Sequence, residues 1–245
     1  MDELLALLAC PETGCTDLSF EGDPLGEGVI RSAEGRVYPV IEGAPRMLPG
    51  DLLKPFLEER DPTFTTRWPE VARWLEDAAE PDPAKLETLL AYSFQHVDLG
   101  NQVPRVEDWH GVLTHFLDGV PLDSFGEDTV LDVGCGGGGQ AYAMASHAKL
   151  IVGLDLSCGF ENILKFERHP NRFYVQGDLM RPPFRKGAFD SMYSHGVLHH
   201  TPDPTASFNA VAPLVRHGGR IMAWVYGLDE MRLSYRISHL TWLRP

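Results

Sequence analysis

The chain has 245 residues, of which 43% are hydrophobic, and its formal net charge at pH 7 is −14. This length is enough to bury the core of one large domain, or of one domain with a small appendage. The negative charge, without any run of basic residues, argues against a nucleic-acid partner, because neutralising phosphates requires clustered lysine and arginine. No stretch reaches the roughly 20 apolar residues of a membrane span, and the acidic start argues against a signal peptide, so we expect no membrane partner and a cytoplasmic location.

Residues 1–50 predict a small β-rich N-terminal domain. A short apolar helix comes first, and residues 37–49 are dense in β-forming and turn residues. Between them, Cys10 and Cys15 bracket a turn with nearly the spacing of one knuckle of a zinc ribbon. A tetrahedral zinc site needs four ligands, and no second cysteine pair follows nearby, so we expect no metal there. The four scattered cysteines are expected to be free thiols.

Residues 51–127 predict a helical cap or linker. Residues 68–75 and 84–96 each show apolar side chains at helical spacing. The candidates for an aromatic wall that contacts a substrate are Tyr92, Phe94, His96 and Trp109. The alternative, which we favour for any one of them, is that these rings only pack the cap onto a sheet.

The most informative segment is residues 130–139, an aliphatic strand that ends in Asp132 and Val133 and runs into a glycine-rich turn. Glycine is needed there because a tight strand-to-helix turn uses unusual backbone dihedral angles and lets a cofactor approach the main chain. A helix is predicted over residues 140–147, with its free N–H groups directed at the turn. Gly134, Gly136 and Gly139 also satisfy the dinucleotide-binding pattern, so the turn alone leaves a nicotinamide-dependent oxidoreductase open.

Four more strands are predicted in the next part of the chain. They cover residues 150–154, 172–176, 189–194 and 220–226, the last following a Gly218-Gly219 turn. The first of these ends in Asp155, where a carboxylate can accept hydrogen bonds from ribose hydroxyls. A proline-containing segment after the histidines, residues 201–204, predicts the start of a helix.

These segments together resemble the class I S-adenosylmethionine-dependent methyltransferases, in particular a small-molecule branch with a GVLHH segment after strand four. The resemblance covers residues 128–226 and rests on VLDVGCGGG, GLDLS, QGDLMRPPF, FDSMYSHGVLHHTPDP and GGRI, which occur in family order. It implies an α/β, Rossmann-like, doubly wound sheet, S-adenosylmethionine as the cofactor, and a small-molecule methyl acceptor. We therefore expect an N-terminal domain at 1–50, a cap at 51–127 and the methyltransferase domain at 128–245.

The resemblance also implies roles for individual residues. The expected cofactor contacts are Asp132, Gly134, Cys135 and Gly136 in the glycine loop, Asp155 and Leu156 after strand two, Asp178 and Leu179 after strand three, and His195 after strand four. The loop residues would hold the methionine part, Asp155 the ribose, and Asp178 with Leu179 the adenine, with His195 beneath the sulfonium. A general base, if one is needed, is expected at His199 or His200, because imidazole titrates near neutral pH. The alternative is that this pair packs beneath the cofactor or caps the next helix.

Both ends of the chain carry further expectations. Residues 1–50, through LLACP and YPVIEGAPRMLP, resemble the zinc-ribbon-like domain that activates some tRNA and protein methyltransferases, which implies a stabilising role in cis. After strand five the family adds strands six and seven, whereas residues 229–243 suggest only a partial helix with Arg232, Arg236 and Trp242. Strand five would then be an open edge, so we expect a homodimer or a partner to cover it, or a longer natural gene product. This departure leaves open an inactive cofactor-binding scaffold; a tRNA methyltransferase is less favoured.

Overall fold

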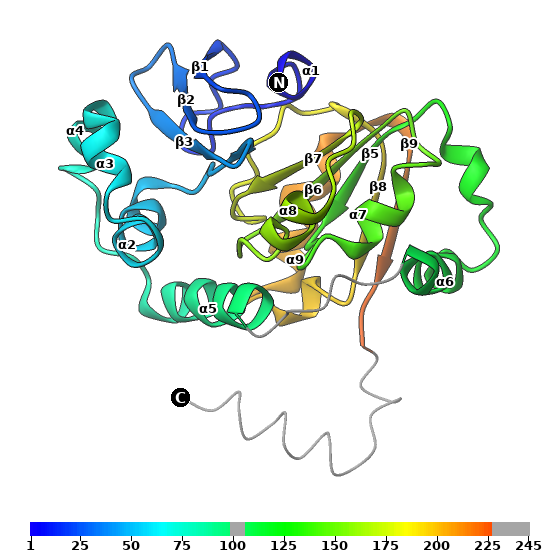
Figure 1. The fold of residues 1–245 in the computed structure, drawn as a ribbon. Helices are drawn as coiled ribbons and strands as arrows, with labels where there is room; N and C mark the ends of the chain where they lie inside the picture. The colour runs from blue at the N-terminus through cyan, green and yellow to red at the C-terminus, as the bar shows by residue number, and fades with distance from the viewer. Residues whose placement is uncertain (99–105, 227–245) are drawn as a thin grey trace.

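A computed structural model describes residues 1–98 and 106–226 of the chain. The predicted partial helix with Arg232, Arg236 and Trp242 lies outside these residues. Figure 1 shows two β-sheets, with the N-terminal sheet in blue beside a larger central sheet. Helices α2, α3 and α4 lie on one side of the molecule and α6 on the other.

The central sheet has five parallel strands in the described part of the chain, in the order β7-β6-β5-β8-β9. Its strands are β5 (Thr129–Val133), β6 (Leu150–Asp155), β7 (Arg172–Gln176), β8 (Phe189–His195) and β9 (Val215–Trp224). Strands β5 and β6 are buried along almost their whole length, as expected for parallel strands with both faces covered. The predicted α/β Rossmann-like sheet is therefore confirmed.

Short helices follow the central strands. They are α7 (Gly139–Met144), α8 (Glu161–Phe166) and α9 (Pro204–Val211), with one-turn 3-10 helices η2 (Leu122–Phe125), η3 (Leu198–His200) and η4 (Ala212–Leu214). The start of α9 is as predicted, because Asp203 accepts a hydrogen bond from Ala206 N at 2.9 Å and Pro204 occupies the first helical position.

The N-terminal unit is an antiparallel sheet preceded by a short helix. Its elements are α1 (Asp2–Leu5), β1 (Leu18–Gly22), β2 (Gly28–Ser32), β3 (Val37–Ile41) and β4 (Ala44–Pro45), paired in chain order. Cys10 and Cys15 close a turn in which Cys10 N donates to Cys15 O at 2.8 Å. The Cys10 thiol lies 3.1 Å from the Tyr38 hydroxyl, and both cysteines are free. Within the described residues no three potential ligands are arranged to hold a metal ion.

The N-terminal unit covers the β7 edge of the central sheet. Met47 N donates to Gln176 O at 2.7 Å, and two further main-chain bonds join Ala9 to Pro183 and Arg185 to Leu7, each at 2.9 Å. One cluster of buried apolar side chains runs through both sheets. It includes Leu8, Val29, Val133 and Val152. The proposed boundary near residue 50 stays a prediction, since this core crosses it.

The described part of the cap contains five α-helices. They are α2 (Gly50–Arg60), α3 (Phe64–Arg67), α4 (Pro69–Leu75), α5 (Pro83–Ser93) and α6 (Val106–Phe116). The prediction of one continuous helix over 84–96 is wrong at its end, where α5 changes into a π-helical turn, η1 (Phe94–Asp98). The Asn162 side chain donates to His96 O at 3.1 Å and to Val97 O at 3.3 Å. In a continuing α-helix these carbonyls would accept hydrogen bonds from main-chain N–H groups of the next turn.

Two other predicted boundaries differ from the structure. The helix after the glycine turn ends at Met144 and does not reach residue 147. Strand five begins at Val215, ahead of Gly218 and Gly219, and its pairing with β8 shifts register in this region. In the described residues β9 is an edge of the sheet, and a homodimer or partner there stays a prediction. No helix in the described parts has the length and apolar character needed to span a membrane.

A buried ion pair ties the N-terminal unit to α8. The Arg46 side chain, which follows β4, is 0% exposed, and its Nη2 lies 2.6 Å from Glu161 Oε1. Its guanidinium also lies 5.4 Å from the centre of the Phe160 ring. The Nε and Nη1 atoms of Arg46 have no hydrogen-bond partner among the described residues. Glu161 is therefore the main compensation for a charge removed from water.

Replacing one member of this pair should destabilise the protein strongly. We expect Arg46→Met to lower the free energy of unfolding by about 3 kcal/mol, because Glu161 then keeps a largely buried charge without its partner. Arg36→Met is the control, since Arg36 is 39% exposed and pairs with Glu12 at the surface; we expect a loss of less than about 1 kcal/mol. Urea denaturation followed by tryptophan fluorescence measures both, and equal losses would contradict the assignment.

Candidate functional site

A cavity of about 320 Å³ lies at the carboxyl ends of the central strands. Its volume falls within the roughly 300–1,000 Å³ range of small-molecule sites. The lining residues are Thr88, Tyr92, His96, Gly134, Gly136, Leu154, Asp155, Leu156, Gly177, Leu179, His195, Gly196, Val197, His200 and Thr201. A second cavity, of about 350 Å³, lies among α2, α3 and α4 and contains none of the predicted site residues.

The glycine loop and the end of β6 are joined through the Asp155 carboxylate. Its Oδ2 accepts a hydrogen bond from Gly136 N at 2.8 Å. Its Oδ1 accepts from Ser157 N at 2.8 Å and from Ser157 Oγ at 2.7 Å. These donors fix the carboxylate at the cavity wall, and Oδ2, which accepts one hydrogen bond, keeps acceptor capacity for a ligand hydroxyl.

Two predicted loop residues lie behind the cavity wall. Asp132 and Cys135 are buried, and neither lines the cavity. Burial is the main cause that raises the pKa of Asp132 to about 8; the Tyr193 hydroxyl opposes it, and the charge of Asp155 adds a smaller increase that is included in this value. Burial also raises the pKa of the Cys135 thiol well above its usual value. Neither side chain borders the cavity.

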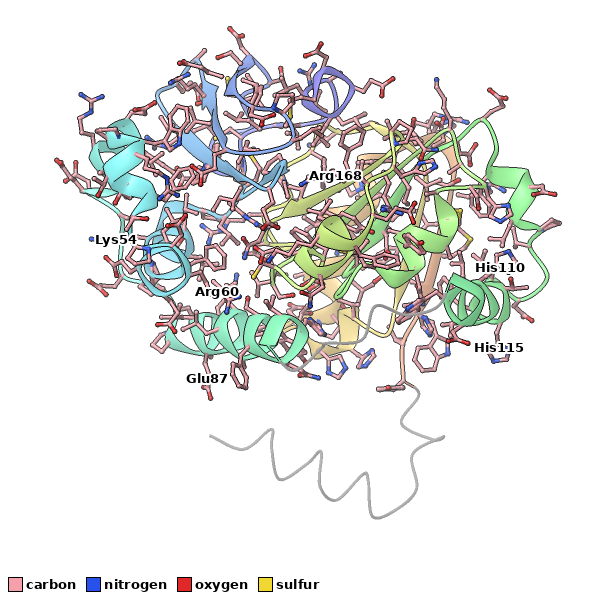
Figure 2. The ribbon with its side chains drawn as sticks, viewed as in Figure 1. Lys54, Arg60, Glu87, His110, His115 and Arg168 are labelled. Atoms are coloured by element: carbon pink, nitrogen blue, oxygen red, sulfur yellow. The ribbon has the colours of Figure 1, made fainter. Side chains whose placement is uncertain are left out.

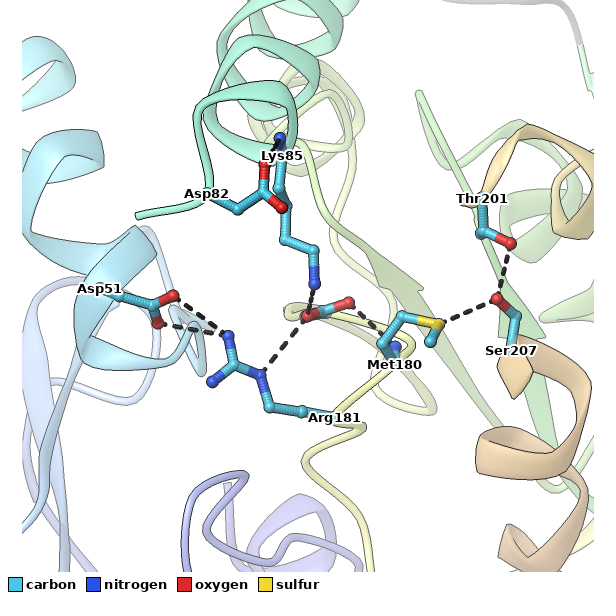
Figure 3. Close-up of polar contacts among 8 residues, drawn as sticks. Asp51, Asp82, Lys85, Met180, Arg181, Thr201 and Ser207 are labelled. Carbon is cyan, nitrogen blue, oxygen red and sulfur yellow. Dashed lines mark hydrogen bonds and ion pairs between the residues drawn. The ribbon is translucent and has the colours of Figure 1, made fainter. Parts of the chain in front are cut away.

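Asp178 is engaged by the protein itself (Figure 3). Its Oδ2 lies 2.7 Å from Lys85 Nζ on α5 and 3.6 Å from Arg181 Nε. Its Oδ1 accepts from Met180 N at 2.9 Å. The Asp178 side chain is only 5% exposed and does not line the cavity, whereas Leu179 does. The ion pair with Lys85 thus holds α5 against the loop after β7.

His195 lies at the opposite wall within a group of rings. Its ring stacks on Phe116 with centroids 4.6 Å apart and meets the edge of Trp224 at 5.2 Å. Gln140 Nε2 lies 2.6 Å from His195 Nδ1, where an amide N–H can donate to the ring nitrogen. Burial lowers the pKa of His195, and the charge of His115 lowers it further. A neutral imidazole is therefore favoured there.

The two candidate bases both lie in the 3-10 turn η3, but only one of them borders the cavity. His200 lines the cavity, and His199 does not. The His199 ring packs between His200 and Tyr226, with centroid distances of 4.1 and 4.3 Å. Of the pair, only His200 is placed to meet a ligand in the cavity.

One face of α5 and η1 forms the remaining wall. Thr88, Tyr92 and His96 line the cavity, and Lys85 on the same helical stripe contacts the loop after β7. The Tyr92 and His96 rings lie 5.8 Å apart. Glu87 projects outward from the other side of α5 (Figure 2).

Two aromatic candidates point elsewhere. Phe94 is 56% exposed and does not line the cavity, because the π-helical turn directs it outward. The Trp109 indole packs on the start of α7, where a Cβ added at Gly139 would lie only 2.2 Å from it. Trp109 packs against α7, as the packing alternative describes, whereas Phe94 is largely exposed and packs onto neither the sheet nor the cavity.

Sequence analysis missed several wall residues. They are Thr88, Leu154, Gly177, Gly196, Val197 and Thr201. The helical spacing of positions 85, 88, 92 and 96 is a signal that identifies Thr88 as part of the same face. Ser157 was also missed, and its link to Asp155 depends on a turn that spacing does not reveal.

The buried Asp132 should make stability depend on pH. Its folded pKa of about 8 lies above the unfolded value, so the folded state keeps a proton that the unfolded state releases. Stability is then lost as the pH rises from about 4 to about 8. We expect Asp132→Asn, which has no proton to lose, to gain stability relative to the wild type over this window. Denaturation at about pH 6 and about pH 8 tests this; a pH-independent difference between the two proteins would refute it.

Residues 131–223 match the protein family described as a methyltransferase domain. The tRNA U34 carboxymethyltransferase of Shewanella pealeana is 30% identical over 170 residues, which are 63% of this chain and 49% of that protein. The ubiquinone biosynthesis O-methyltransferase of Escherichia coli O139:H28 is 35% identical over 98 residues, which are 38% of this chain and 40% of that protein. The chain spans about half the length of the curated relatives it matches first.

Solved structures show weaker similarity. A protein of Bacillus halodurans C-125 described as a methyltransferase aligns with a TM-score of 0.44 and 24% identity, over 53% of this chain and 55% of that chain. The complex of the Haloferax volcanii Trm112 methyltransferase activator with a methyltransferase contains a chain that aligns with a TM-score of 0.44 and 23% identity, over 52% of this chain and 57% of that one. The family match itself covers the segment from β5 to β9, with the glycine loop and the wall after β8. Residues 131–223 are therefore similar to a methyltransferase domain.

Proposed function

We propose that this chain binds S-adenosylmethionine in the cavity at the ends of the central strands and methylates a small, uncharged acceptor. The observation that carries the proposal is the composition of the cavity wall. Taken across the sheet from β8 to β7, the wall presents His195 and His200, then the glycine loop, then Asp155 with Leu156, and then Gly177 with Leu179. This order fits a ligand with a polar amino-acid end, a ribose and a flat apolar base.

The residues of the wall fit the parts of this cofactor. Asp155 offers acceptor capacity for ribose hydroxyls while two N–H groups and a hydroxyl fix its position. The leucines offer an apolar surface to an adenine ring. Gly136 has φ of +52°, and the absence of a side chain leaves the main chain of the loop open to the cavity.

The protein's contribution to the reaction is mainly alignment and exclusion of water. When bound, the cofactor would supply a sulfonium-activated methyl group, whose carbon bonds to the nucleophile as the carbon–sulfur bond breaks and the neutral thioether leaves. The walls from α5 and from the segment after β8 would hold the acceptor in line with that methyl group. His200 would accept the proton that a hydroxyl acceptor loses as its oxygen–carbon bond forms.

The charge of the cavity supports an uncharged acceptor. Among the described lining residues there is no lysine or arginine, and Asp155 is the one carboxylate. A phosphorylated acceptor would meet no cationic partner from these side chains. The net charge of −14 supports the same conclusion for a polynucleotide.

A second candidate is transfer of the methyl group of S-adenosylmethionine to tRNA. It is favoured by the relatives named tRNA U34 carboxymethyltransferases, whose name states both a nucleic-acid acceptor and a carboxymethyl group. The two candidates separate in one assay with methyl-labelled S-adenosylmethionine, in which total tRNA and a panel of small phenols are offered in parallel. Label in a phenol supports the proposal, and label in tRNA alone replaces it with the second candidate. Tight cofactor binding with no label in any acceptor would favour an inactive scaffold.

Filling the glycine loop should abolish cofactor binding. We expect Gly136→Val to lose measurable affinity for S-adenosylmethionine and S-adenosylhomocysteine, because φ of +52° is unfavourable for valine and its side chain would enter the cavity. Gly137→Val is the matched control, since a Cβ there meets nothing within 4 Å. Isothermal titration, with NAD as a third ligand, measures all three affinities. Unchanged affinity in the Gly136 variant, or NAD binding in place of the sulfur nucleosides, would contradict the site.

Substitutions of the two histidines of η3 should differ in their effect on the rate of methyl transfer. With a hydroxyl acceptor, we expect His200→Ala to lower kcat by about 100-fold and to change KM little, because a positioned base contributes mainly to the chemical step. His199→Ala should lower kcat by less than about fivefold, since its ring packs against Tyr226 outside the cavity wall. Initial rates at saturating cofactor measure this, and a larger loss for His199 would reverse the assignment.

A further inference from the structure

His96 lies against the glycine loop, although it comes from the cap. If Gly136 carried a Cβ, its nearest neighbours would be His96 Cε1 at 3.4 Å and Nε2 at 3.7 Å. His96 also lines the cavity. This edge of its imidazole therefore faces the part of the loop that the proposed cofactor approaches.

The surrounding chain is built to bring His96 there. The π-helical turn η1 shifts the last turn of α5, and Asn162 holds its carbonyls at His96 and Val97. Gly159 provides the room, because a Cβ at that position would lie 2.5 Å from His96 Cβ and 2.9 Å from Gly136 O. A side chain on residue 159 would thus displace His96 from the loop.

A chain of hydrogen bonds determines which nitrogen of His96 carries a proton. The Asp155 carboxylate only accepts, so Ser157 Oγ must donate its single hydrogen to Asp155 Oδ1. Ser157 Oγ can then only accept from His96 Nδ1, which lies 3.3 Å away. With the proton on Nδ1, the neutral ring carries its lone pair on Nε2. The cap thus presents a hydrogen-bond acceptor to the glycine loop.

The amino-acid end of the proposed cofactor offers a matching donor. It carries an ammonium group with three N–H bonds, which needs acceptors when water is removed. Asp155 is the one carboxylate among the described lining residues, and the family resemblance gives it to the ribose. An imidazole acceptor beside Gly136 is therefore complementary to the ammonium group.

We propose that His96 is a cofactor-binding residue, whose Nε2 accepts a hydrogen bond from the ammonium group at the amino-acid end of the cofactor. This assignment, which rests on the proposed function, moves His96 from the acceptor wall to the cofactor. The continuous segment of α5 and η1 would then contact the cofactor site at both of its ends. Near the start of this segment, Lys85 binds Asp178 after β7. Near its end, His96 contacts Ser157 and the glycine loop.

The test compares two ligands that differ at the amino-acid end. S-Adenosylhomocysteine has the ammonium group, and 5′-methylthioadenosine keeps the adenine, ribose and sulfur but lacks it. We expect His96→Phe, which keeps a ring but has no acceptor, to bind S-adenosylhomocysteine at least about tenfold more weakly. Its affinity for 5′-methylthioadenosine should change by less than about twofold. Isothermal titration of the full chain measures the four dissociation constants.

Two controls keep the outcomes distinct. Glu87→Ala, on the outward side of α5 (Figure 2), should leave both affinities unchanged, which excludes a general effect of changing the helix. Thermal unfolding of each variant without ligand shows that it is folded. An equal loss for both ligands, or no loss for either, overturns the role of His96 and leaves the cofactor assignment intact. Failure of the wild type to bind S-adenosylhomocysteine overturns the proposed function and this inference together.

Discussion

The parallel pairing of β5 with β6 on one side and with β8 on the other is the constraint on which the whole site depends. Its register places Val133 beside Leu154 and Asp132 beside Tyr193, so the three strands end at the same edge of the sheet. The loops that follow are therefore neighbours in space, although long stretches of chain separate them. A glycine loop, a carboxylate and a histidine segment meet around one cavity because of this geometry, and none of them forms a site alone.

The N-terminal unit and the cap support this edge in different ways. The N-terminal sheet binds the outer strand, β7, through main-chain hydrogen bonds and the buried Arg46–Glu161 pair. Gln176, at the end of β7, connects this supported strand to the cavity, because its side chain donates to the main-chain oxygen of the wall residue Leu156 at 3.0 Å. The cap instead crosses the carboxyl edge of the sheet, where Lys85 of α5 binds Asp178 and His96 of η1 contacts Ser157. Three of the described lining residues, Thr88, Tyr92 and His96, thus come from outside the matched family segment.

Strands β5 to β8 could be predicted because each ends at a glycine or an acidic residue, whereas the start of β9 could not, because after Val215 its first residues are polar or glycine. The glycine loop, Asp155 and the histidine segment followed from the same pattern. Side-chain direction could not be predicted where tertiary contacts decide it. Asn162 binds the main chain of the π-helical turn after α5, where Phe94 is exposed and His96 lines the cavity. The Trp109 indole is fixed by its contact with Gly139 at the start of α7. The burial of Asp132 and the engagement of Asp178 by Lys85 likewise depend on elements distant in sequence.

The cover on β7 belongs to the same polypeptide as the strand that it covers. A separate subunit in this place would leave the edge exposed whenever dilution separated the two, whereas a covalently attached sheet remains at a constant effective concentration. Chain order adds a second consequence. Because synthesis proceeds from the N-terminus, the covering sheet leaves the ribosome before β7 does. The open edge therefore meets its own cover first, before a second nascent chain can pair with it and begin to aggregate.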